Sequence, residues 1–203
     1  VKTIPYRTQF SLDVEPQLTP LNFFERLEQD LHEADSLLAD VDPVITYGVD
    51  GDPMDDFLKH RNLRMNYYAV QALAMRVYYT MGNDEKALEY AKKIIAVQES
   101  HFPWIKPNRL TAAVPDRVFT SEVIFGLQNL QRNNLYTSLF DGSNLKLSSL
   151  LAPRTDCVKQ IFENDQVDYR YSSALKNQVE ISGTQYSIFN KYQGESSDSL
   201  CNQ

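Results

Sequence analysis

The first long stretch of apolar residues at helical spacing begins at Thr19-Pro20. Thr can cap the free amides of a first helical turn, and Pro at the first helical position has no amide to leave unpaired. Apolar residues then recur every three or four positions to about Asp40, and they are Leu21, Phe24, Leu27, Leu31, Ala34, Leu38 and Val41. Pro43 ends this helix, and two glycines and a proline predict a loop over residues 44–56.

Two further helices are predicted over residues 62–81 and 84–98, with only Gly82-Asn83 at the break. Leu63, Tyr67, Val70, Ala74, Val77 and Met81 share one side of the first, and Ala87, Leu88, Ala91, Ile94 and Ile95 mark the second. Because the connection is so short, we expect the two helices to form an antiparallel hairpin.

This hairpin resembles a tetratricopeptide repeat, a helix-turn-helix unit of about 34 residues. The signature positions of the family correspond to Met75, Tyr78, Gly82, Ala87, Leu88, Tyr90 and Ile94. Gly82 would supply the turn, Ala87 would let the helices approach closely, and Tyr78 would fill the space between them. Met75 and Ile94 are larger than is usual at their positions, so the copy is divergent.

After His101 the chain is punctuated by prolines, and its periodic stretches are short. Residues 118–127 and 185–192 are rich enough in β-branched and aromatic residues to predict short strands. Residues 153–163 predict one helix, with Val158, Ile161 and Phe162 facing inward. The second half is therefore expected to be mostly loop, with a few strands and a helix.

Composition and charge exclude several classes of protein. The 203 residues include 42% hydrophobic residues, enough for a core of normal size. The net charge is −7, and no run of Lys and Arg offers a surface for a phosphate backbone, so nucleic acid is not an expected partner. No stretch approaches the roughly 18 apolar residues of a membrane span. Cys157 and Cys201 are too few for a disulfide scaffold or a cysteine zinc site.

Four segments together reach along nearly the whole chain. The first is residues 23–31 (Phe-Phe-Glu-Arg-Leu-Glu-Gln-Asp-Leu) with Ala34 and Leu37-Leu38, and the second is residues 62–66 (Asn-Leu-Arg-Met-Asn) leading into Ala69, Ala72, residues 75–78 and Gly82. The third is residues 121–125 (Ser-Glu-Val-Ile-Phe), and the fourth is residues 168–170 (Asp-Tyr-Arg). In this order they resemble the SusD/RagB family of outer-membrane nutrient-binding lipoproteins, and the order is the specific part of the resemblance.

The resemblance implies a mainly α fold of tetratricopeptide-like helical hairpins with long loop insertions and a few short strands. Residues 1–203 would be one SusD-like region, an internal fragment of a longer protein, with residues 19–99 as the helical repeat part and residues 100–203 as the loop-rich part. The full-length protein would be surface-exposed on the outer membrane, with its lipid anchor outside this chain.

For function, the resemblance implies capture of an oligosaccharide or polysaccharide for nutrient uptake with a TonB-dependent outer-membrane transporter (SusC-like). It implies no cofactor and no chemistry on the ligand. Three alternatives stay open, a peptide-binding member of the same family, an intracellular tetratricopeptide scaffold and a glycan-cleaving enzyme.

Aromatic residues in the predicted loops are the candidate ligand-binding residues, because sugar rings present flat C–H faces that pack on aromatic faces. They are Trp104, Phe102, Tyr47, Tyr136 and Phe140. Their alternative role is core packing beneath long loops. Trp104 stands between Pro103 and Pro107, so it is either a rigid platform for a sugar or a buried plug.

The zinc-protease and calcium-binding motifs that the sequence partly resembles each lack a required residue. His32-Glu33 begins like a zinc-protease helix, but Ser36 stands where the second histidine is required. The acidic residues 50–56 have Met54 at a calcium-ligand position, which favours a solvated turn. We expect no catalytic and no metal-binding residues. Asp168 and Arg170 favour a buried ion pair that fixes the loop before Tyr171, and the alternative is contact with a ligand.

Overall fold

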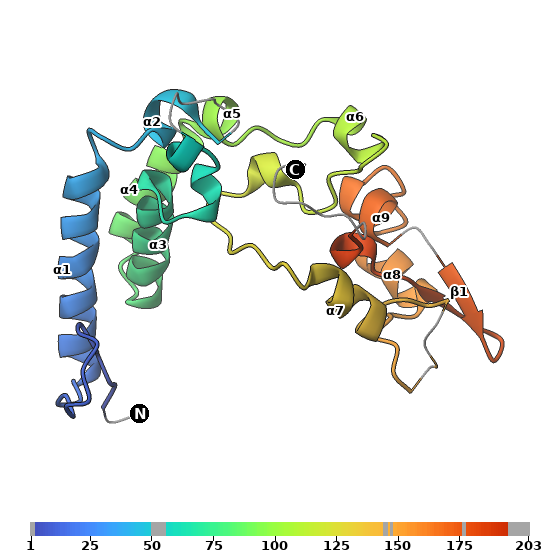
Figure 1. The fold of residues 1–203 in the computed structure, drawn as a ribbon, viewed down its shortest axis with the longest axis horizontal. Helices are drawn as coiled ribbons and strands as arrows, with labels where there is room; N and C mark the ends of the chain where they lie inside the picture. Colours follow the sequence, from blue (N-terminus) through green and yellow to red (C-terminus); the bar gives the residue numbers. More distant parts are fainter. Residues whose placement is uncertain (1–2, 50–55, 144–145, 147, 176–177, 195–203) are drawn as a thin grey trace. The chain divides into compact units, whose positions relative to one another are not determined.

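The computed structural model describes residues 3–49, 56–143, 146, 148–175 and 178–194. It divides into two compact units, the first formed by Val1–Pro103 and Ser121–Leu127, the second by Trp104–Thr120 and Gln128–Gln203. In the part described, the fold is mainly helical with one two-stranded sheet, as the sequence predicts (Figure 1). No helix in these ranges is long and apolar enough to cross a membrane.

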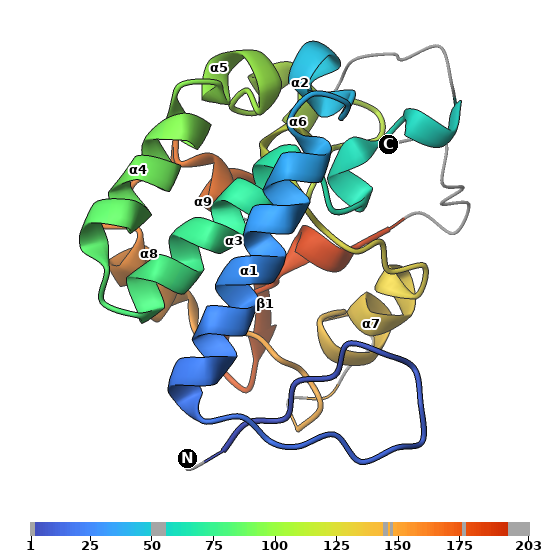
Figure 2. The same ribbon diagram turned by 90° about the vertical axis from the view of Figure 1, so that its left-hand side faces the viewer.

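Three long helices form the first unit: α1 (Pro20–Leu38), α3 (Tyr67–Thr80) and α4 (Asp84–Ile95). The views in Figures 1 and 2 show them side by side, with contacts from α3 to both α1 and α4. The Thr19 hydroxyl accepts a hydrogen bond from the Asn22 amide at 3.3 Å, so the predicted cap of α1 is confirmed. The antiparallel hairpin of α3 and α4 is also confirmed.

The apolar stripes of the three helices meet in one core. Its buried members are Leu31, Val70, Ala74, Val77, Tyr78, Ala87 and Tyr90. Tyr78 and Ala87 are both in it, as the hairpin prediction requires. α4 is capped by Asn83, whose side chain accepts from the Lys86 amide at 3.1 Å, one residue before the expected start.

The predicted boundaries around residues 44–66 are partly wrong. Residues 44–47 were expected in a loop, yet they form the short helix α2 (Val44–Tyr47), because Val44 is fully buried beside Val49, Tyr68 and Phe102. The helix expected from residue 62 begins at Tyr67. It follows two 3-10 turns, η1 (Asp56–Leu58) and η2 (Arg61–Leu63), and a further short helix, α5 (Gln98–His101), follows α4.

The second unit contains short elements. They are α6 (Pro107–Leu110), α7 (Arg132–Leu139), α8 (Thr155–Ile161), α9 (Tyr169–Ala174), strands β1 (Gln178–Ile181) and β2 (Thr184–Ser187), and the 3-10 turn η4 (Asn190–Tyr192). The strands pair antiparallel, from Gln178 opposite Ser187 to Ile181 opposite Thr184. Ser182 and Gly183 form the tight turn between them with φ of 52° and 77°, a conformation that favours glycine.

Predictions for the second half have mixed outcomes. The helix over residues 153–163 is confirmed as α8, with Val158 buried, but Ile161 is exposed rather than inward. The strand over residues 185–192 is right only up to Ser187, where β2 ends.

The strand expected over residues 118–127 is wrong. The carboxylate of Asp116 accepts hydrogen bonds from the amides of Val118, Phe119 and Thr120 at 3.2, 2.9 and 2.8 Å. These bonds wrap the chain into a turn, and η3 (Thr120–Glu122) follows. A strand would need those amides for pairing with a neighbour, and here the side chain takes them.

Candidate functional site

Trp104 is the most exposed of the predicted ligand-binding rings, with 70% of its surface open to solvent. It lies on a short segment without regular structure that ends at Pro107, where α6 begins. The residue that follows it in the second unit, Ile105, is buried.

Phe102 and Tyr136 are core residues. Phe102 packs beside Val44 and Val49 and meets the ring of Tyr68 edge to face, with 5.5 Å between ring centroids. Tyr136 was expected in a loop but lies on α7, where it packs with the buried core of the second unit. Because neither ring presents an open face in its unit, a ligand role for these two residues has no geometric support.

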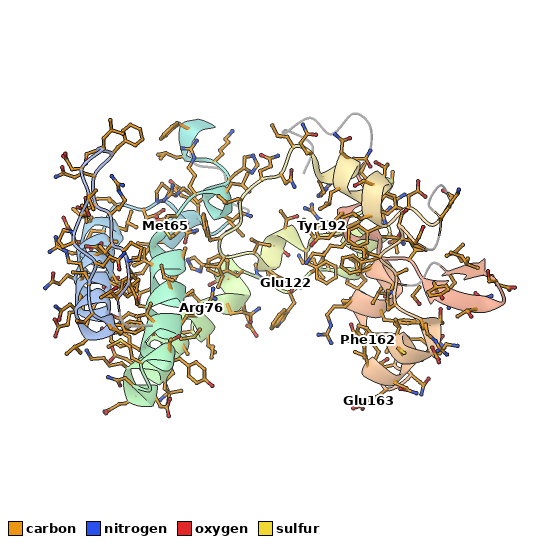
Figure 3. All side chains as sticks on the ribbon, turned by 90° about the horizontal axis from the view of Figure 1, so that it is seen from below. Met65, Arg76, Glu122, Phe162, Glu163 and Tyr192 are labelled. Atoms are coloured by element: carbon orange, nitrogen blue, oxygen red, sulfur yellow. The ribbon has the colours of Figure 1, made fainter. Side chains whose placement is uncertain are left out.

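Phe140 is half-buried in a group of three rings in the second unit. It follows the last residue of α7, and its ring centroid lies 5.6 Å from that of Phe189 and 5.5 Å from that of Tyr192. Tyr192, labelled in Figure 3, lies among these rings. Phe140 and Tyr192 pack against the buried core around Ile188, and Phe189 contacts both of these rings. The three rings therefore contribute to the packing of the second unit whether or not they contact a ligand.

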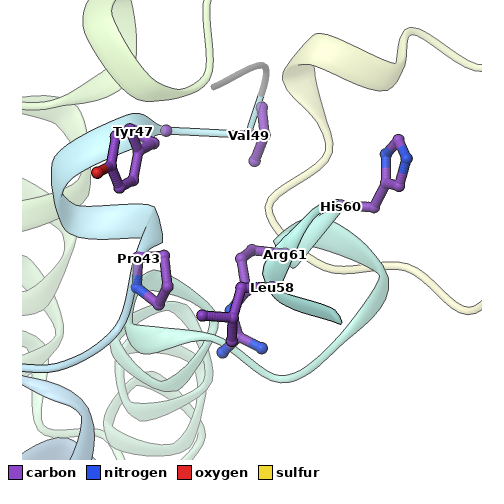
Figure 4. A pocket seen from close by; sticks show the side chains of 7 residues that line it. Pro43, Tyr47, Val49, Leu58, His60 and Arg61 are labelled. Atoms are coloured by element: carbon purple, nitrogen blue, oxygen red, sulfur yellow. The ribbon is translucent and has the colours of Figure 1, made fainter. Parts of the chain in front are cut away.

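Tyr47 is 49% exposed at the end of α2. Its ring stands at a hollow whose lining is shown in Figure 4 and consists of Pro43, Tyr47, Gly48, Val49, Leu58, His60 and Arg61. The hollow measures about 170 Å³ including the space open to solvent. Pockets that enclose a small molecule measure at least about 300 Å³. Tyr47 can therefore offer a ring to a ligand on the surface, but the hollow does not enclose one.

Arg61, which lines this hollow, belongs to a largely buried ion pair that the sequence did not predict. Arg61 donates to both carboxylate oxygens of Asp42, from Nε to Oδ1 at 2.9 Å and from Nη2 to Oδ2 at 2.7 Å. The backbone amides of Val44 and Tyr67 donate to the same carboxylate at 3.1 and 2.9 Å. One buried side chain thus fixes the starts of α2, η2 and α3.

These four bonds decide the charge state of Asp42. Burial raises the pKa of its carboxyl, but the hydrogen bonds from Arg61 and the two amides outweigh burial, and the net pKa lies below its ordinary value. The available signal in the sequence was Asp42-Pro43, since Asp before Pro often bonds to the amide two residues on. The partner Arg61 stands 19 residues away and carries no local signal.

Asn66 joins two of the segments that carry the family resemblance. The residue is fully buried, and its Oδ1 accepts from the Ala69 amide at 2.9 Å, which caps α3. Its Nδ2 donates to the Ile124 carbonyl at 2.8 Å. The Gly126 amide in turn donates to the Asn62 carbonyl at 2.8 Å. Residues 62–66 and 121–125 therefore lie together in the first unit.

The predicted pair of Asp168 and Arg170 is present, but on the surface. Asp168 caps α9 by accepting from the Arg170 amide at 2.8 Å, and Arg170 pairs with the same carboxylate. The guanidinium is largely exposed and lies over the ring of Phe162 at 5.6 Å from its centroid. The pair fixes a helix start, which is the structural role expected for it.

Metal ligands and cysteines were the remaining candidates for a site in the described parts of the chain. Within those parts, no three His, Cys, Asp or Glu side chains gather into a set that could hold a metal ion. Residues 50–55, which make up most of the acidic segment, lie outside the described residues, as does Cys201. Cys157 is exposed.

Comparisons with protein-family models, with characterised proteins and with solved structures found no match for this chain. A function must therefore be argued from the exposed rings and from the segments quoted above.

Proposed function

We propose that this chain belongs to a glycan-binding protein of the SusD/RagB type, which holds an oligosaccharide at the cell surface for a TonB-dependent transporter and does not cleave it. The proposal includes an outer-membrane location and a lipid anchor in the full-length protein. Its scaffold would be the tetratricopeptide-like array of which α3 and α4 form one hairpin.

The observation that carries the proposal is the exposed ring of Trp104 on a non-helical segment. Pro103 and Pro107 fix two backbone angles close to the ring, so a sugar that stacks on it would lose little loop entropy on binding.

A second observation supports the family part of the proposal. The Asn-Leu-Arg-Met-Asn segment and the Ser-Glu-Val-Ile-Phe segment, which are far apart along the chain, are joined through Asn66 and Gly126. Two segments that pack together in one unit are constrained together, which is the kind of pair that a family would retain in the same order.

The experiment is a binding titration of the wild type, Trp104→Ala and the control Tyr79→Ala against a panel of soluble plant, fungal and host polysaccharides. Tyr79 is equally exposed, but on α3 of the first unit. For a stacking platform we expect Trp104→Ala to weaken binding about tenfold or more, equivalent to about 1.4 kcal/mol. Tyr79→Ala should bind like the wild type.

Two outcomes contradict the proposal. Undiminished binding by a folded Trp104→Ala variant would remove Trp104 as the platform, and binding of oligopeptides but no glycan would favour the peptide-binding alternative. Incubation of the intact protein with each bound glycan, followed by analysis of the products, tests the expected lack of cleavage. Co-purification with a TonB-dependent transporter from the outer membrane tests the partner.

A further inference from the structure

Polar side chains on the three helices of the first unit repeat at a spacing of seven residues. Seven residues are about two helical turns, or about 10.5 Å along the axis, so both members of each pair lie on one face of their helix. The pairs are Glu28 and Asp35 on α1, Tyr78 and Gln71 on α3, and Lys86 and Lys93 on α4. Together they form two polar rungs, each with a carboxylate, a central residue and a lysine.

The first rung is closed by hydrogen bonds. Tyr78 Oη donates to Glu28 Oε1 at 2.6 Å, and Lys86 Nζ reaches the same oxygen at 2.9 Å. Lys86 Nζ also lies 3.4 Å from Tyr78 Oη. Burial and then the bond to Glu28 raise the pKa of Tyr78 to about 12, while the donors Tyr78 and Lys86 lower the pKa of Glu28. This rung fastens α1 to α4 across α3.

The second rung is open. Gln71 is fully buried, and its Nε2 donates to Asp35 Oδ1, but its Oε1 is buried without a hydrogen-bond partner. Lys93, which corresponds to the lysine of the first rung, instead pairs with Glu89 on its own helix at 3.2 Å. The side chains of Lys93 and Glu89 are 43% and 63% exposed.

The two lysines occupy equivalent positions on a stacked pair of rings. Lys86 Nζ lies 4.6 Å from the centroid of Tyr78, and Lys93 Nζ lies 4.3 Å from the centroid of Tyr90. The rings of Tyr78 and Tyr90 are stacked with 5.5 Å between centroids. Each lysine therefore lies over one ring of the same stacked pair.

The pKa values of Tyr67 and Tyr90 respond to the charges of both Asp35 and Lys93. Burial raises the pKa of both Tyr67 and Tyr90, the charge of Asp35 raises each further, and the charge of Lys93 opposes it. Asp35 and Lys93 thus both act on the same two hydroxyls, although they lie on different helices.

We propose that Lys93 has a second position, in which its ammonium donates to Gln71 Oε1 and Asp35 and closes the second rung. An exposed pair at i and i+4 stabilises a helix only slightly, whereas a buried acceptor without a donor is costly. Closure would give the buried acceptor a donor and pair the ammonium with Asp35, and these gains offset the cost of desolvating Lys93.

Closure would act on the chain that follows α1. Asp35 is one turn from the end of α1 at Leu38, and the chain then leads directly to Asp42 and to α2, which carries Tyr47. A closed second rung would fasten this end of α1 to α4, whereas in the open state only the first rung joins the two helices by such bonds in the described chain. The rung is thus a conformational device at the base of the Tyr47 segment.

The test is a set of unfolding measurements on the full chain. Lys93→Met is compared with Lys92→Met, a matched change at the neighbouring exposed lysine of α4. Loss of a stabilising rung should favour the unfolded state, so we expect Lys93→Met to raise the equilibrium constant for unfolding about fivefold to thirtyfold. Lys92→Met should have little effect. The effect of Lys93→Met should persist in a Glu89→Gln background and disappear in a Gln71→Met background.

The opposite pattern would overturn the proposal. If the effect of Lys93→Met disappears with Glu89→Gln and persists with Gln71→Met, the lysine acts only through its exposed partner. A second measurement needs no variant at Gln71: nuclear Overhauser contacts from the Lys93 ε-methylene to Gln71 or Asp35 in the wild type are expected, and contacts to Glu89 alone would exclude the second position.

Discussion

Removal of the Asp42 carboxylate should strongly destabilise the first unit. Asp42→Ala leaves the guanidinium of Arg61, whose side chain is only 12% exposed, without its counter-ion. It also leaves the amides of Val44 and Tyr67 without acceptors. Loss of one partner of a buried pair costs about 3–5 kcal/mol, because the remaining charge stays desolvated.

This loss is large compared with the total stability of a domain, which is about 5–15 kcal/mol. Urea unfolding followed by circular dichroism at 222 nm reports mainly on the long helices α1, α3 and α4 and is the suitable assay. The matched control is Asp156→Ala, because Arg154 contacts Asp156 in the same two-point manner but with both side chains largely exposed. The control variant should unfold like the wild type.

The same pair predicts a pH dependence with a definite sign. The pKa of Asp42 in the folded chain lies below its ordinary value of about 3.9 in unfolded chains. A lowered carboxyl pKa stabilises the fold fully above the unfolded value, and this stabilisation is lost as the pH falls through the folded value. The difference between wild type and Asp42→Asn should therefore be larger at pH 7 than at pH 3. Equal differences at both pH values, or equal losses in Asp42→Ala and Asp156→Ala, would refute this account.

Three further variants test the packing. Ala87→Phe should overfill the interface of α3 and α4 and cost about 1–3 kcal/mol, whereas Ala96→Phe, at the exposed end of α4, should be neutral in thermal unfolding. Gly142→Ala would place a methyl group against Ile188 Cδ1, so we expect a loss of about 1 kcal/mol in the second unit, and an unchanged melting temperature would contradict the packing described. Trp104→Ala should cost far less than the roughly 3–5 kcal/mol of a buried aromatic, because most of the ring is already in solvent.

The long helices were predictable because one local rule determines them. Apolar positions in α1, α3 and α4 recur every three or four residues, and each helix buries a single stripe in one core. Thr19 and the Gly82-Asn83 turn then set the boundaries. The tetratricopeptide character of the hairpin and the SusD/RagB assignment stay predictions, since they concern more than the arrangement of three helices.

The irregular segments were not predictable in the same way, because side chains distant in sequence decide them. Asp42 bonds to an amide 25 residues later, and Asn66 bonds to a carbonyl 58 residues later. Asp116 takes the amides that a strand over residues 118–127 would have used. Residue preferences for strands cannot foresee such competition, since it depends on which acceptor is brought near by the rest of the fold.

The exposure of the candidate binding residues could not be predicted from the sequence either, as residues 102–105 show. Phe102 is buried, Trp104 is exposed and Ile105 is buried, although all three are large and apolar and lie on one irregular segment. No periodicity separates them, since the pattern fits neither the spacing of a helix nor the alternation of a strand. The difference comes from the cores that receive the neighbours, with Phe102 packed against Val44 and Tyr68. An exposed side chain such as Trp104 has few packing partners to constrain its identity. If the proposed function is right, a ligand platform at such a position would leave no fixed motif in the sequence, and a pattern search could not find it.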